Sequence, residues 1–185
     1  MPSLLVTLRD LLLLRRGPQD LPYSPVLLAI AALASLLVSQ WAANVLLPQR
    51  QDQLISVVAA LALHLGLLYL LLNALQRQAR FVQTATASLC IDVVFTTAML
   101  PGLMIVQPLL SATGAPPPPE AITGVAFLAS LLLIGLAIWR IVVDAHILRQ
   151  TLEIRLVPAL LINMALLFAG QIVLGALFGG AAEGN

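Results

Sequence analysis

The chain has 185 residues, of which 61% are hydrophobic and only 9% are charged. Soluble domains contain roughly 45–50% apolar and 25% charged residues, so a soluble fold of this size could not cover so much apolar surface. The net charge of +1 gives no support for a nucleic-acid partner or an acidic substrate. We therefore expect an all-α, polytopic membrane protein with one transmembrane domain over residues 1–180 and a short disordered tail over 181–185.

The first predicted element is a short amphipathic helix that precedes the long apolar runs. Its leucines recur at helical spacing, while Thr7, Arg9 and Asp10 fall on the other side; the leucines are Leu4, Leu5, Leu8, Leu11 and Leu12. This pattern predicts a helix that ends near Gly17-Pro18 and lies in the membrane interface. Whether it does more than anchor the chain stays open.

Five apolar segments follow, each long enough to cross a bilayer as a helix. A spanning helix needs about 20 apolar residues with few charges. Hydrogen bonding in hydrocarbon favours helices, and the alternation typical of a membrane barrel is absent. The third segment contains Pro101-Gly102, which predicts a kink or a helix break. The predicted spans are 25–47, 53–75, 82–109, 121–148 and 156–179.

The arginines predict the orientation of these spans. All nine basic residues are arginine. If the N-terminus is cytoplasmic, eight of them lie on the inner side and only Arg50 lies outside, as the positive-inside rule demands. We therefore expect a multi-pass protein of a bacterial inner membrane, with its N-terminus inside and its C-terminus outside.

His64 and Asp92 are ionisable residues that fall at similar depth in the second and third spans. Each is costly in hydrocarbon unless it is paired or hydrated. One hypothesis is a proton relay or ion site formed by the two side chains. A second is a hydrogen-bonded pair that only fixes helix register. In a third, Asp92 bonds within its own helix to Ser88 or Thr96.

The fourth span carries a second group of charges toward its cytoplasmic end. Arg140 and Asp144 are one helical turn apart, so an ion pair within the helix is expected. The pair could be merely interfacial. Alternatively, Arg140, Asp144 and Arg149 could contact a lipid phosphate or the carboxylate of a partner protein.

Gly175 and Gly179 in the fifth span have the G-x-x-x-G spacing that allows two helices to approach closely, within one chain or between two. Motifs for nucleotide binding, zinc proteases and serine hydrolases are absent. One cysteine and two histidines leave no typical zinc site. We expect no metal, no cofactor and no enzymatic activity.

A resemblance to a known family rests on the loop between the second and third spans. Residues 76–84 form a basic loop that ends in Arg80-Phe81-Val82-Gln83, followed by a long span with a proline and a fourth span that contains Trp139. This arrangement resembles bacterial five-span proteins of the Yip1 domain family. The resemblance implies a non-enzymatic membrane protein whose eukaryotic counterparts assist vesicle trafficking through partner binding.

Two functions therefore remain after the sequence has been read. The first is a membrane scaffold or accessory subunit, which contacts itself or other membrane proteins through its helices within the lipid bilayer. The alternative is a small transporter or proton-coupled carrier centred on His64 and Asp92. A sealed contact around Asp92 would favour the scaffold, whereas a polar cavity would favour the carrier.

Overall fold

The computed structural model describes residues 4–46, 53–110 and 123–178, and within these ranges the regular elements are all helical. The short elements are α1 (Leu4–Leu12) and the single 3₁₀ turns η1 (Pro18–Asp20) and η2 (Gln78–Arg80). The long helices are α2 (Pro25–Leu46), α3 (Gln53–Ala74), α4 (Phe81–Leu110), α5 (Gly124–Leu152) and α6 (Leu156–Phe178). The predicted tail, 181–185, lies outside the described residues.

The five long helices confirm the prediction of an all-α polytopic bundle. Each is long and apolar enough to cross a membrane. Their ends agree with the predicted spans to within four residues. The agreement has a simple cause: an apolar run flanked by polar residues can satisfy its backbone in lipid only as a helix, so composition alone marks both ends.

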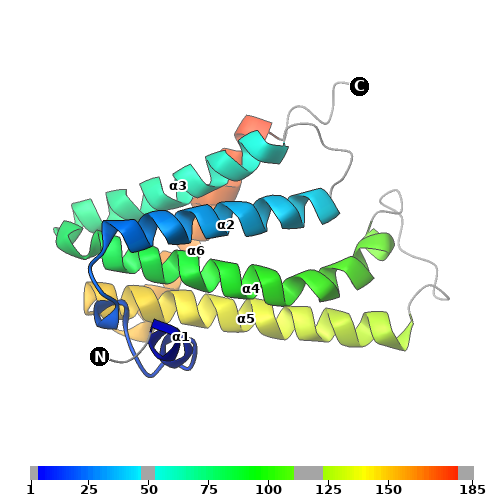
Figure 1. Ribbon diagram of the computed structural model, residues 1–185, viewed down its shortest axis with the longest axis horizontal. Helices are drawn as coiled ribbons and strands as arrows, with labels where there is room; N and C mark the ends of the chain where they lie inside the picture. Colours follow the sequence, from blue (N-terminus) through cyan, green and yellow to red (C-terminus); the bar gives the residue numbers. More distant parts are fainter. Residues whose placement is uncertain (1–3, 47–52, 111–122, 179–185) are drawn as a thin grey trace.

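The long helices pack side by side as a bundle (Figure 1). Helix α2 packs against α3 and α4, α5 packs against α4 and α6, and α3 packs against α6. These contacts close a ring in the order α2, α3, α6, α5, α4. Consequently, residues on the inner faces of all five helices can meet although they are far apart in sequence.

Helix α4 decides between the kink and the break predicted at Pro101-Gly102, because it is bent but continuous (Figure 1). It continues through both Pro101 and Pro108, and Figure 1 shows it bending toward its C-terminal end. Gly102 is buried, and a Cβ atom there would lie 3.0 Å from Leu133 Cδ2 of α5. The missing side chain thus allows α4 and α5 to pack closely, and the proline bends the helix without ending it.

Helix α1 is docked against the bundle, and this corrects the predicted face. Thr7 and Asp10, which the leucine pattern placed on the polar side, are buried together with Leu11, whereas Leu5 is 77% exposed. Arg16 Nε lies 3.2 Å from Asp10 Oδ2, so the buried carboxylate is paired. Leu11 joins a core cluster with residues of α4 and α5. One side of α1, with Thr7, Asp10 and Leu11, therefore packs against the bundle, and the side with Leu5 is exposed.

The loops at the same end of the bundle are tied together by an ion-pair cluster. Glu153 follows α5 with a left-handed backbone (φ 58°) and accepts from Arg80 and, at 2.9 Å, from Arg77. Arg80 also donates to the carbonyl oxygens of Gln150 and Thr151, at 3.3 and 2.9 Å. A cation is favourable there because the last carbonyls of a helix lack partners.

Candidate functional site

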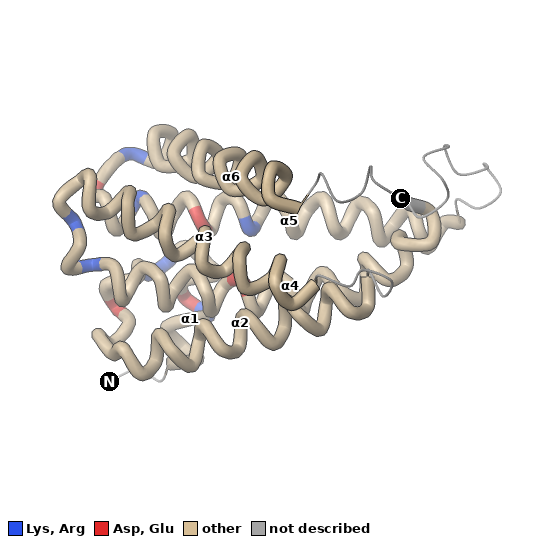
Figure 2. Tube along the Cα trace, turned by 90° about the horizontal axis from the view of Figure 1, so that it is seen from above, with Lys and Arg blue, Asp and Glu red and all other residues tan. Residues whose placement is uncertain are grey.

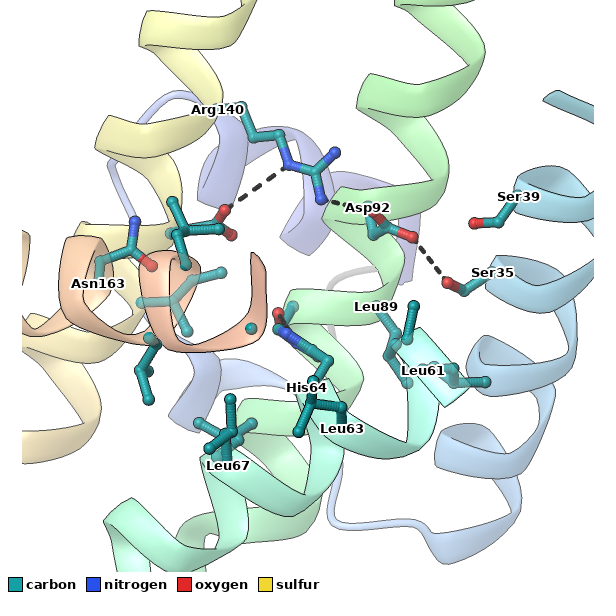
Figure 3. A pocket seen from close by; sticks show the side chains of 18 of the residues that line it. Ser35, Ser39, Leu61, Leu63, His64, Leu67, Leu89, Asp92, Arg140 and Asn163 are labelled. Atoms are coloured by element: carbon teal, nitrogen blue, oxygen red, sulfur yellow. Dashed lines mark hydrogen bonds and ion pairs between the residues drawn. The ribbon is translucent and has the colours of Figure 1, made fainter. Parts of the chain in front are cut away.

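A cavity of about 310 Å³ lies inside the ring of helices and is partly open at its surface. All five long helices contribute to its lining. Figure 3 shows that their polar side chains converge on it from different sides. Those side chains are Ser35 and Ser39 of α2, His64 of α3, Thr84, Ser88 and Asp92 of α4, Arg140 and Asp144 of α5, and Asn163 and Gln171 of α6.

Asp92 is held by residues of two neighbouring helices. Arg140 Nη2 donates to Asp92 Oδ1 at 2.5 Å, and the Ser35 hydroxyl donates to Asp92 Oδ2 at 2.7 Å. Each carboxylate oxygen therefore has its own partner, and α2, α4 and α5 are joined at one point. A charged guanidinium–carboxylate bond is among the strongest hydrogen bonds in proteins.

His64 lines the same cavity but bonds elsewhere. Its Nε2 lies 2.9 Å from the Ser88 hydroxyl oxygen of α4. Among the described residues, no hydrogen bond or ion pair joins His64 to Asp92. The two predicted residues thus share a cavity without direct contact, and Ser88 serves His64 instead of Asp92.

Arg140 lies much deeper than the sequence interpretation assumed. At 1.5 Å per residue, it is about 18 Å from Leu152 at the end of α5, and Asp92 is about 16 Å from Phe81 at the start of α4. Both therefore lie several turns inside their spanning helices. The predicted contact of Arg140 with a lipid phosphate or a partner's carboxylate stays a hypothesis, and the carboxylate that the structure places beside Arg140 is Asp92 of the same chain.

Asp144 is the second carboxylate beside Arg140, but its contact is longer. Arg140 Nε lies 3.8 Å from Asp144 Oδ2, as the one-turn spacing predicted. This separation is too long for a hydrogen bond. Arg140 thus lies between two carboxylates and is bound tightly by only one, Asp92.

Two other predicted site residues, Arg149 and Gly175, do not line the cavity. Arg149 is exposed near the end of α5. A Cβ atom added to Gly175 would meet nothing within 4 Å, so no helix of this chain packs closely there. Its expected partner in the motif, Gly179, lies outside the described residues. The described part of the chain also contains no group of three or more His, Cys, Asp or Glu residues that could hold a metal ion.

Comparisons with protein-family models, with curated proteins and with solved structures find no match in any of the three. The resemblance to the Yip1 domain family therefore stays a hypothesis, and no functional residue is transferred from a relative.

Sequence reasoning missed two of the contacts that define the site's chemistry. It did not place Arg140 beside Asp92, although counting residues inward from the end of the fourth span gives a similar depth. It also did not consider Ser35, which is one of several small polar residues in an apolar helix. Nothing in the sequence says which helices are neighbours, and that information decides both contacts.

Proposed function

We propose that this protein is a small membrane carrier that binds a polar solute in the cavity between its five helices. The observation that carries the proposal is that Asp92, Arg140 and Asp144 line a partly open cavity well inside the five candidate spans. Charged residues at this depth typically mark a solute or ion pathway. A scaffold needs neither buried charges nor a cavity to present its outer helix faces to a partner.

The orientation predicted from the arginines is part of this proposal. Apart from Arg140, the described arginines gather at the end of the bundle where α1 lies (Figure 2). On the positive-inside rule that end is cytoplasmic. Because the number of spans is odd, the N-terminus would then be cytoplasmic and the C-terminus external. The membrane that we propose is a bacterial inner membrane.

Water access to the cavity tests the carrier without knowledge of its solute. A cysteine reacts with thiosulfonate reagents as the thiolate, which forms in water and not in hydrocarbon. Ser39 lines the cavity. Leu37, two residues earlier on the same helix, does not line it and is 61% exposed on the outside of the bundle. In a Cys90→Ala background, Ser39→Cys should react with a charged, membrane-impermeant methanethiosulfonate, and Leu37→Cys should not.

The side from which Ser39→Cys reacts separates a carrier from a one-sided binding protein. Reaction in both right-side-out and inverted vesicles is expected for a carrier, because its cavity must open to each side in turn. Absence of reaction in both vesicle types would mean that the cavity is dry. That outcome would favour the membrane scaffold over the carrier.

A further inference from the structure

The charges that line the cavity do not balance. Asp92 and Asp144 supply two carboxylates, and Arg140 supplies one guanidinium. His64 shares one ring nitrogen with a neutral hydroxyl, that of Ser88, and has no bonded carboxylate in the described structure. With both carboxylates ionised, the cluster carries one uncompensated negative charge, which is costly at mid-bilayer.

The excess charge belongs to Asp144 on geometric grounds. Asp92 receives two hydrogen bonds, one to each oxygen, from Ser35 and Arg140. Among the described residues, Asp144 has only the 3.8 Å approach of Arg140, and it lines the cavity to which Asn163 of α6 also contributes. The nitrogen of Asn163 is engaged with the carbonyl of Ile141 at 3.4 Å.

The remainder of the cavity is apolar. Leucines of α3 and α6 form much of its wall: Leu61, Leu63, Leu67, Leu166, Leu167 and Leu174. Ligand sites typically combine such a wall with a few polar groups that fix orientation. A ligand that suits this lining has one cationic head and a short apolar body.

We infer that the solute is a small organic cation, whose charged head pairs with Asp144 while its apolar part lies against the leucines of α3 and α6. This inference rests on the proposed carrier function and adds the class of solute. The cation supplies the missing positive charge, so the bound cluster is neutral. Arg140 stays with Asp92, and no covalent change is involved.

The test uses hexyltrimethylammonium, which is permanently charged and cannot act through a proton. Its neutral and anionic counterparts are hexanol and hexanoate. With the purified full chain carrying Cys90→Ala and Ser39→Cys, hexyltrimethylammonium should slow thiol labelling at concentrations at least about tenfold below those at which either counterpart acts. Equal protection by all three compounds, or protection by none, would overturn the inference.

Two charge-matched variants locate the effect. Asp144→Asn should weaken protection by at least about tenfold, whereas Glu153→Gln, which changes net charge equally but lies outside the cavity, should leave it unchanged. If Asp144→Asn does not fold, Asp144→Glu serves as the second variant. It keeps the charge and should therefore retain protection, and loss of protection in a folded Asp144→Glu variant would contradict the assignment. Unchanged protection in a folded Asp144→Asn variant would contradict the assignment.

The failure of this inference can be told apart from failure of the proposed function. Labelling of Ser39→Cys without protection by hexyltrimethylammonium keeps a hydrated cavity and rejects the cation. Lower pH slows labelling in any case, because it protonates the thiolate. An additional pH dependence that Asp144→Asn abolishes, with no effect of the organic cation, would identify a proton as the balancing charge and would also reject the inference. Absence of labelling removes the carrier itself.

Discussion

At the scale of single residues, the site depends on how Arg140 is shared. Its guanidinium is bound to Asp92 at 2.5 Å and approaches Asp144 at 3.8 Å. Asp92 and His64 line one cavity, but the similar depth inferred for them from the sequence could not choose the partner of Asp92. The partner of Asp92 depends on which neighbouring helix carries a polar side chain that faces it. Ser35 and Arg140 face it, whereas His64 forms a hydrogen bond with Ser88.

A double-mutant cycle tests the Arg140–Asp92 pair. Arg140→Gln and Asp92→Asn each leave one charge without its partner, so each should lower the free energy of unfolding in bicelles. The double variant should lose less than the sum, with a coupling above the average of about 0.6 kcal/mol for polar contacts in membranes.

The matched control for that cycle is His64→Leu combined with Asp92→Asn. These residues share the cavity without a hydrogen bond, so their losses should add to within about 0.5 kcal/mol. A larger coupling between His64 and Asp92 than between Arg140 and Asp92 would contradict the arrangement described above.

At the scale of elements, the spans could be predicted because apolar length is a property of each segment alone. The features that could not be predicted are those that depend on which helices pack against each other. Pro101-Gly102 was expected to kink or to break its helix, and the sequence could not choose; α4 bends, continues through Pro101 and packs Gly102 against Leu133 (Figure 1). Helix α1 was assigned a polar face from its leucine spacing, but Asp10 turns inward because Arg9 and Arg16 neutralise it.

The docking of α1 predicts different outcomes for two leucines. Leu11 is fully buried against α4 and α5, whereas Leu5 is 77% exposed. Leu11→Asn should therefore release α1 and expose Arg9, Arg15 and Arg16 to trypsin in inverted vesicles, since burying an unpaired amide costs about 1–3 kcal/mol. Leu5→Asn should leave the cleavage rate close to that of the unmodified chain. Equal cleavage of both variants would mean that α1 is held only by lipid.

The cluster at the end of α5 predicts a dependence of stability on pH. Hydrogen bonds from Arg80 and then Arg77 lower the pKa of Glu153 below its ordinary value of 4.5. A carboxyl whose pKa is lowered by folding stabilises the fold fully above pH 4.5, and that contribution is lost as the pH falls through the lowered pKa. The free energy of unfolding of Glu153→Gln should thus be lower than that of the parent at pH 7, and the difference should vanish in strong acid. A difference that persists unchanged in acid would show that the glutamate acts through packing instead of charge.

At the scale of the whole molecule, the number of helices and their all-α class followed from composition and arginine placement. The ring of five helices and the cavity inside it did not. Every helix is apolar nearly all round, so hydrophobic pattern cannot say which face of a membrane helix meets protein and which meets lipid. Only the few polar residues carry that information, and they become informative once the helices are assembled.

The orientation of the whole molecule can be tested with two exposed positions at opposite ends of the bundle. Gln78 lies in η2 and Gly124 starts α5. In a Cys90→Ala background and intact cells, Gly124→Cys should react with an impermeant maleimide and Gln78→Cys should react only after permeabilisation. The reverse labelling would invert the proposed topology while leaving the fold unchanged.

The unequal lengths of the helices have a consequence for the surrounding lipid. Helices α4 and α5, with 30 and 29 residues, exceed the 22 residues of α2 and α3, and Figure 1 shows them reaching further at the end away from α1. The difference corresponds to about 10–12 Å of helix. Exposed apolar side chains such as Ile105 and Phe127 cover the projecting part. The protein is therefore thicker on one flank than on the other, and its hydrophobic mismatch should tilt it or thicken the bilayer along the α4–α5 flank alone.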